Sequence, residues 1–303
     1  MEDIATNHIK SLRRLRRRFQ EERAKLGIAW EIIEQDYLLS WMLAAISSIP
    51  KLKETLIFKG GTALKKCYFE DYRFSQDLDF SITSNAPRGA ELQSFMIKAG
   101  KLVQELILKN STNVEIICEA YKEKQPHPFG QEAFTISAKY PWHNQYNTRV
   151  MVEITMEEPV LLTPIERNIL HGYDEQMDCT IKTYALEEIV AEKIRAILQY
   201  AKKLHERGWG RSRARDYYDL WRILTQKHMQ LNLEIIPSLI EQKCALKGVA
   251  FTAVDDLFTE KLMYDLAKAW SEWLEPLVPD LPELEVVLGK LKENLAFISY
   301  KNY

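Results

Sequence analysis

The chain has 303 residues, a mass of 35.5 kDa, 46% hydrophobic residues and a formal net charge of −2, which suggests two structural units with a sizeable core. Its four cysteines are scattered without a CxxC pair, which indicates a reducing cytoplasmic environment and argues against a zinc site. Because there is neither an apolar run of bilayer-spanning length nor an apolar signal core, we expect a cytoplasmic protein with no membrane association.

Two helices are predicted at the start of the chain, over residues 4–25 and 32–49, and both should pack behind a sheet. The first carries a basic cluster: Lys10, Arg13, Arg14, Arg16, Arg17 and Arg18. A solvated helix face is favoured over an RNA-binding surface, because Glu21 and Glu22 follow at once. In the second helix Asp36 either packs in the core or faces a functional site.

The stretch from residue 55 to residue 82 predicts a strand, a glycine turn, a short helix and a second strand. The turn, residues 60–62, reads Gly-Gly-Thr, and glycines there let the backbone approach a phosphate closely. Asp77 and Asp79 lie two apart on the second strand, so both leave the same face. Taken singly, such a turn is often only turn geometry and such a pair only a solvated strand face. Together they indicate a site for a nucleotide and its Mg²⁺.

These motifs resemble those of a known family. GGTALKK followed by RFSQDLDFS is similar to the signature of the AbiEii/AbiGii nucleotidyltransferase toxins, within the polymerase-β-like nucleotidyltransferase superfamily. The residues that narrow the resemblance to this family are Arg73, Ser75, Asp77 and Asp79.

After a predicted helix over residues 87–108, three strands are expected, over residues 114–121, 133–140 and 149–155. Loops rich in turn-forming residues separate them, so an antiparallel meander is the economical arrangement. In the third strand Glu153 falls on the polar face. By position it is the candidate for the third carboxylate of the superfamily; the alternative is an ordinary sheet-surface residue paired with Arg149.

Residues 156–182 show few periodic signals and form the expected boundary between a nucleotidyltransferase core with N-terminal helices, 1–182, and a helical domain, 183–303. His171 lies among loop signals, which favours a surface position over a metal ligand.

On the helix predicted from residue 186 to about 206, Lys193 falls inside the apolar arc, where a lysine needs an anion. On the next helix Asp216 faces inward, whereas Asp219 lies nearer the edge of the arc. Because a short link makes the helices antiparallel neighbours, Lys193 and Asp216 should meet. Spacing alone favours an ion pair that ties the helices together. The resemblance of AEKIRAI and RDYYDL to two further family motifs implies instead that both residues take part in activity.

A basic loop, with Arg207, Arg211, Arg213 and Arg215, joins these two helices. Under the resemblance, its arginines border the triphosphate or RNA path. Further helices are expected over residues 233–243, 252–277 and 284–297. Their aromatic residues recur at helical spacing, which favours core or helix interfaces over a base-stacking platform: Phe251, Phe258, Tyr264, Trp270 and Trp273.

The resemblance implies an α+β fold, with a polymerase-β-like core (a mixed or antiparallel sheet flanked by helices) and a C-terminal helical bundle. It implies Mg²⁺-dependent transfer of a nucleoside monophosphate from an NTP to a hydroxyl, with one or two Mg²⁺ ions at Asp77 and Asp79. The expected phosphate ligands are Gly60, Gly61, Thr62, Arg73 and Ser75, with Lys193 neutralising charge and Asp216 positioning Lys193 or acting as a base.

The family also implies a toxin of a bacterial toxin–antitoxin or abortive-infection system, with a cognate antitoxin and with RNA, specifically tRNA, as the leading acceptor. Two alternatives remain: a nucleotidyltransferase acting on a small molecule or a protein hydroxyl, and a catalytically idle module that binds a nucleotide or a partner.

Overall fold

The computed structural model describes residues 13–110, 112–121 and 130–301. The chain divides into two compact units, Met1–Tyr184 and Ala185–Tyr303. Within the described ranges, no helix is both long and apolar enough to cross a membrane.

The first unit is built on one seven-stranded mixed sheet with the order β3-β4-β5-β2-β1-β7-β6. Its strands are β1 Leu56–Lys59, β2 Asp77–Ile82, β3 Glu115–Tyr121, β4 Gln131–Lys139, β5 Thr148–Thr155, β6 Ile165–Asn168 and β7 Thr180–Thr183. β2 and β5 are parallel neighbours at the centre, and β1 pairs with β2 antiparallel. The predicted antiparallel meander is confirmed in β3, β4 and β5.

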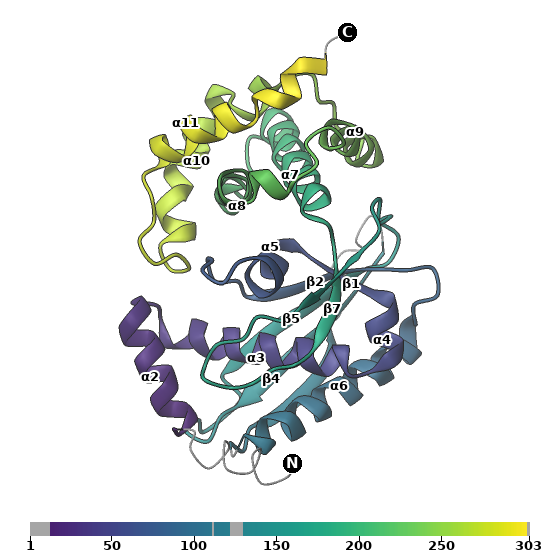
Figure 1. The fold of residues 1–303 in the computed structure, drawn as a ribbon, viewed down its shortest axis with the longest axis vertical. Helices are drawn as coiled ribbons and strands as arrows, with labels where there is room; N and C mark the ends of the chain where they lie inside the picture. The colour runs from purple at the N-terminus through teal and green to yellow at the C-terminus, as the bar shows by residue number, and fades with distance from the viewer. Residues whose placement is uncertain (1–12, 111, 122–129, 302–303) are drawn as a thin grey trace. The chain divides into compact units, whose positions relative to one another are not determined.

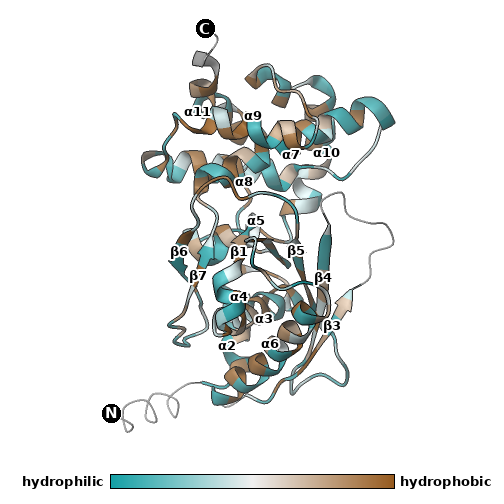
Figure 2. Cartoon of the chain, turned by 90° about the vertical axis from the view of Figure 1, so that its right-hand side faces the viewer, coloured by the Kyte–Doolittle hydropathy of each residue, from teal (hydrophilic) through white to brown (hydrophobic). Residues whose placement is uncertain are grey.

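Two long helices cover one face of this sheet, α3 (Trp30–Ser47) and α6 (Gly89–Lys109), as Figure 1 shows. α3 is apolar on nearly all sides and almost entirely buried, as a helix enclosed by its neighbours must be. α6 alternates between polar and apolar residues along its length (Figure 2), so it keeps one face in solvent. α2 (Leu15–Leu26) packs against α3, and the short α4 (Pro50–Thr55) leads into β1.

The segment expected to form the boundary, residues 156–182, ends next to the division between the two units, but it also contains two strands that the sequence did not predict, β6 and β7. Each strand has only four residues, too few for a period to show in the sequence. β7 pairs with β1 in parallel through Phe58 and Thr183. The sheet therefore extends to the end of the first unit.

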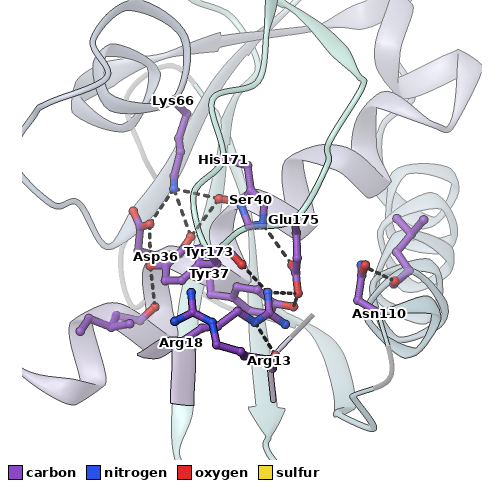
Figure 3. A network of polar contacts seen from close by, with 12 residues as sticks. Arg13, Arg18, Asp36, Tyr37, Ser40, Lys66, Asn110, His171, Tyr173 and Glu175 are labelled. Carbon is purple, nitrogen blue, oxygen red and sulfur yellow. Dashed lines mark hydrogen bonds and ion pairs between the residues drawn. The ribbon is translucent and has the colours of Figure 1, made fainter. Parts of the chain in front are cut away.

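Polar residues buried behind the sheet form a connected network (Figure 3). At one end Arg18 of α2 lies 2.7 Å from Glu175, and both side chains are buried. Glu175 also accepts a hydrogen bond from Tyr37 and contacts His171 at 3.2 Å. His171 was expected at the surface, but only 1% of its side chain is exposed, and this burial lowers its pKa. A charged partner from its own loop, Glu175, and aromatic partners from α3, Tyr37 and Trp41, explain the difference.

At the other end of the network Asp36 meets Lys66. The ammonium of Lys66 lies 2.8 Å from Asp36 Oδ2 and donates to Ser40 at 2.8 Å. Tyr173 donates to the same carboxylate at 3.0 Å. Burial alone raises the pKa of Asp36, but the ammonium groups of Lys66 and Lys65 outweigh it and hold that pKa below its ordinary value. Asp36 therefore packs in the core as a charged group.

Replacing Asp36 with asparagine is expected to destabilise the protein by about 3–5 kcal/mol near pH 7, because the buried Lys66 ammonium loses its carboxylate. Burial already lowers the pKa of Lys66 to about 8 from 10.5. Without its carboxylate the ammonium has a still lower pKa, so the folded variant gives up this proton at a lower pH than wild type does, and its extra cost fades as the pH rises toward 8. Urea unfolding at pH 6.5 and pH 9 should show the difference between wild type and Asp36→Asn narrowing at the higher pH.

The double variant Asp36→Asn/Lys66→Met is the control, and it should recover part of the lost stability because it removes the buried charge altogether. A loss in Asp36→Asn that is equal at both pH values would contradict this account of the pair.

The second unit is helical. Its α-helices are α7 Leu186–Arg207, α8 Ala214–Gln226, α9 Ile236–Leu246, α10 Glu260–Leu274 and α11 Leu284–Asn294. α7 packs against α8, α9 and α10, and α8 packs against α10 and α11. The sequence predicts a single helix over residues 252–277. The structure has two separate elements there: a 3-10 turn, Val254–Leu257, and then α10, which starts at Glu260.

Candidate active site

The glycine turn follows β1 directly and opens a short helix, α5 (Gly60–Ala63), which continues as a π-helical turn, Leu64–Tyr68. Gly60 has a φ of +79°, a conformation that other residues adopt only with strain. The first backbone N–H groups of a helix have no partner inside it, so they can bind an anion. A π turn in this position is also frequent at functional sites.

Both glycines are required by neighbouring side chains of the site. A Cβ atom at Gly60 would lie 2.4 Å from Asp79 Oδ2, and one at Gly61 would lie 2.2 Å from an Nη atom of Arg73. Arg73 is buried and donates to the carbonyl of Phe74 at 3.1 Å. The missing Cβ atoms thus let a carboxylate and a guanidinium pack directly on the turn.

β2 carries the two aspartates as predicted. Asp77 and Asp79 are half-buried, whereas Leu78 and Phe80 are fully buried on the opposite face. In the parallel pairing with β5, Asp79 lies opposite Glu153. Because side chains at paired positions leave the same face, the three carboxylates share one side of the sheet. Glu153 alternates with the buried Val152 and Ile154, so its placement on the polar face is confirmed.

Thr62 and Ser75 join the glycine turn to the start of β2. The Thr62 hydroxyl is buried, lies 2.6 Å from the Ser75 hydroxyl and also contacts the carbonyl of Asp77. A hydroxyl has one hydrogen to donate, and that of Thr62 is used inside the protein. What Thr62 offers a phosphate is therefore its backbone N–H.

The donor set suits a hard divalent cation. Across the described ranges, no three His, Cys, Asp or Glu side chains are gathered so that they could hold a metal ion by themselves. Mg²⁺ does not require such a cage, since proteins commonly bind it through one or two carboxylates with substrate phosphates and water completing the octahedron. Asp77 and Asp79, on one face beside the glycine turn, fit that mode of binding.

Lys59 is a residue of the site that was not predicted from the sequence. It is the cross-strand partner of Asp79 in the antiparallel β1–β2 pair, and its ammonium lies 3.3 Å from Glu158 in a buried ion pair. A lysine beside two carboxylates reduces their mutual repulsion. The signal was available, because Lys59 is the one charged residue in an otherwise apolar strand and directly precedes the glycines.

The second unit holds a separate cluster around Lys193. Its ammonium lies 3.1 Å from Asp216 Oδ1 and also contacts Asp219 Oδ2. The predicted meeting of Lys193 and Asp216 is confirmed, but the placement of Asp219 near the edge was wrong: its side chain is 0% exposed, against 16% for Asp216. Packing of α8 between α7, α10 and α11 encloses a face that a single helical wheel leaves open.

The basic loop leads directly into this cluster. Arg213 precedes α8 and lies 3.5 Å from Asp216 Oδ2. Arg211 is exposed, and its guanidinium lies 5.4 Å from the ring centroid of Trp273, where Arg215 lies at 5.6 Å. The loop therefore presents positive charge next to the carboxylate of Asp216 and next to an aromatic ring.

Replacing Gly60 with alanine is expected to reduce catalytic activity by about tenfold or more, because the new Cβ must displace the carboxylate of Asp79 and the backbone there is left-handed. Gly289→Ala is the matched control: Gly289 lies in α11, has a negative φ and has nothing within 4 Å of its added Cβ. It should keep full activity. Catalytic activity equal in the two variants would contradict the assigned role of Gly60.

Comparisons with known proteins identify the family and the fold. A family model described as the nucleotidyl transferase AbiEii toxin of type IV toxin–antitoxin systems matches residues 41–293. The chain belongs to this family. No curated protein matches it in sequence. Among solved structures it is similar to MenT4, a nucleotidyltransferase toxin from Mycobacterium tuberculosis H37Rv, with a TM-score of 0.62, 17% identity and coverage of 100% of this chain and 90% of that one.

AbiEii family membership makes the protein a nucleotidyltransferase and the toxin of a type IV toxin–antitoxin system. An NTP substrate and a cognate antitoxin follow from the family. The likeness to MenT4 confirms the expected α+β fold.

Proposed function

We propose that the protein transfers a nucleoside monophosphate from an NTP to a hydroxyl group of RNA, with tRNA as the leading acceptor, in a reaction that depends on Mg²⁺. The observation that carries this proposal is the alignment of Asp77 and Asp79 on one face of β2, beside a glycine turn on which Asp79 and Arg73 pack. Such a face can hold a triphosphate and the cation that accompanies it.

In the proposed reaction the acceptor oxygen attacks the α-phosphorus, the bond from that phosphorus to the oxygen bridging the α- and β-phosphates breaks, and pyrophosphate leaves. When bound, Mg²⁺ polarises the hydroxyl and offsets charge on the triphosphate. Asp77 and Asp79 would hold it, and Glu153, on the same face of the sheet, is proposed to support it through bound water. Backbone N–H groups at Gly60, Gly61 and Thr62 and the side chains of Arg73 and Ser75 bind the phosphates.

The proposed role of Lys193 is to neutralise charge that builds on the phosphates in the transition state. The two carboxylates paired with Lys193 differ in solvent exposure, which suggests different roles for them. Asp219, fully buried, is suited to fix the position of the ammonium. Asp216, part-exposed, is suited to accept the proton of the acceptor hydroxyl. Arg211, Arg213 and Arg215 are proposed to contact RNA or phosphate.

The test is incubation of the protein with each α-³²P-labelled NTP, Mg²⁺ and total bacterial tRNA, followed by separation of RNA, protein and small molecules. Label in RNA that disappears with EDTA is the expected result. Label confined to protein or to a small molecule would replace the RNA acceptor with that class. If no fraction is labelled and Asp79→Ala leaves growth inhibition unchanged, the proposed reaction is wrong.

A further inference from the structure

The loop between α7 and α8 displays a tryptophan to solvent. Trp209 is 73% exposed, although burying an indole is strongly favourable. Trp209 lies between two glycines that have different structural roles. Gly208, in the left-handed conformation at φ +79°, ends α7. Gly210 packs so closely on the ring of Tyr200 that a Cβ there would lie 2.7 Å from it.

The loop is anchored on both sides of this tryptophan. The Tyr200 hydroxyl donates to Asp265 of α10 at 2.7 Å and lies 3.4 Å from the carbonyl oxygen of Gly210, so the glycine packs against a ring that is itself fixed. Arg211, the next residue, extends its guanidinium to the ring of Trp273. Trp209 is thus held outward by a positioned backbone.

Charge and aromatic surface coincide here. Two guanidinium groups lie against Trp273, which is itself half-buried, and Arg213 continues the positive charge to Asp216. Aromatic faces beside arginines are the usual means of binding single-stranded nucleic acid, because every base can stack and every nucleotide carries a phosphate. Paired bases are already stacked on their neighbours and offer no free face.

We propose that Trp209, Arg211 and Trp273 form a binding surface for an unpaired stretch of the acceptor RNA, with one base stacked on Trp209 and the guanidinium of Arg211 on the adjoining phosphate. This rests on the proposed RNA acceptor and adds to it the form of the RNA: a strand with unpaired terminal nucleotides. In the basic cluster at α2 part of the charge is already neutralised, since Arg13 is paired with Glu21 and Asp174, and Arg18 is buried against Glu175.

The experiment measures binding of the full-length protein, without NTP, to a fluorescent RNA hairpin with an unpaired 3′ tail and to the same hairpin with a blunt end. Wild type should bind the tailed hairpin more tightly. Trp209→Ala should weaken that binding about tenfold, the usual loss for one stacked base, and Trp209→Phe should retain most of it. Neither change should affect the blunt hairpin.

Arg211→Gln separates charge from stacking. It should lower the slope of log affinity against log salt by about 0.7, the value for one phosphate contact on a single strand, whereas Trp209→Ala should leave the slope unchanged. Two matched controls should bind as wild type: Tyr264→Ala, an aromatic 66% exposed on α10, and Arg16→Gln, an exposed arginine of α2.

Equal affinity of wild type and Trp209→Ala for the tailed hairpin would overturn the proposal. The transfer assay distinguishes this from failure of the proposed function. If labelled RNA forms but binding does not depend on Trp209, the surface is wrong and the reaction stands. If the tailed hairpin is not bound and no RNA is labelled, both are wrong.

Discussion

Asp79→Asn is expected to reduce nucleotidyl transfer by about a hundredfold to a thousandfold, the usual range when a group that stabilises transition-state charge is removed. Asp79 is the carboxylate that packs on Gly60 and lies opposite both Lys59 and Glu153 in the sheet. Asparagine keeps the shape but not the negative charge that attracts a cation. The measurement is the initial rate of label transfer from α-³²P-NTP under saturating Mg²⁺.

Asp77→Asn should behave in the same way, because it leaves the same face of β2. Glu70→Gln, which removes an exposed carboxylate from the same unit, is the matched control and should keep full activity. Thermal unfolding of each variant must show the fold retained. A folded Asp79→Asn protein that transfers label at the wild-type rate would remove Asp79 from the mechanism.

The central part of this site could be predicted because its signals are local. Alternation of Asp77, Leu78, Asp79 and Phe80 requires only that the segment be a strand with one buried face. The same reasoning placed Glu153 on the polar face of β5, although its register with Asp79 came only with the structure. The register between two strands depends on the whole sheet and cannot be predicted from the residue pattern of one strand alone.

What could not be predicted depends on contacts between distant segments. His171 is buried because Tyr37 and Trp41 of α3, distant in sequence, pack on its ring beside the nearby Glu175, and the contacts with α3 have no local pattern. The role of the glycines is another case. The sequence indicated room for a phosphate, whereas the structure shows Asp79 and Arg73 packed where the two Cβ atoms would stand. The two interpretations are compatible, because the side chains of Asp79 and Arg73 then line the turn at which a phosphate would bind.

Aromatic spacing in the second unit shows the limit of a helical period. Trp270 is buried as expected, at 5% exposure, but Tyr264 on the same helix is 66% exposed. The two differ by six residues, which places them on different faces of α10. Trp273 is half-buried under two arginines, so a position that the spacing assigned to the interior borders the basic loop.

Lys193→Met is expected to abolish transfer and also to destabilise the protein by about 3–5 kcal/mol, since the fully buried carboxylate of Asp219 loses the ammonium beside it. Loss of activity in this variant therefore does not by itself separate catalysis from folding. Urea unfolding and the transfer assay must be run on the same preparations.

The double variant Lys193→Met/Asp219→Leu makes that separation. It replaces a buried ion pair by apolar groups of similar size, which is often neutral for stability. If Lys193 neutralises charge in the transition state, the double variant should regain most of the lost stability and none of the activity. Asp216→Asn is the third test. Because the side chain is part-exposed, the substitution should lower the free energy of unfolding by about 1 kcal/mol or less. Transfer should nevertheless fall about a hundredfold if Asp216 accepts the proton of the acceptor hydroxyl. Recovery of transfer in the double variant would show that the cluster only links α7 to α8 and takes no part in catalysis.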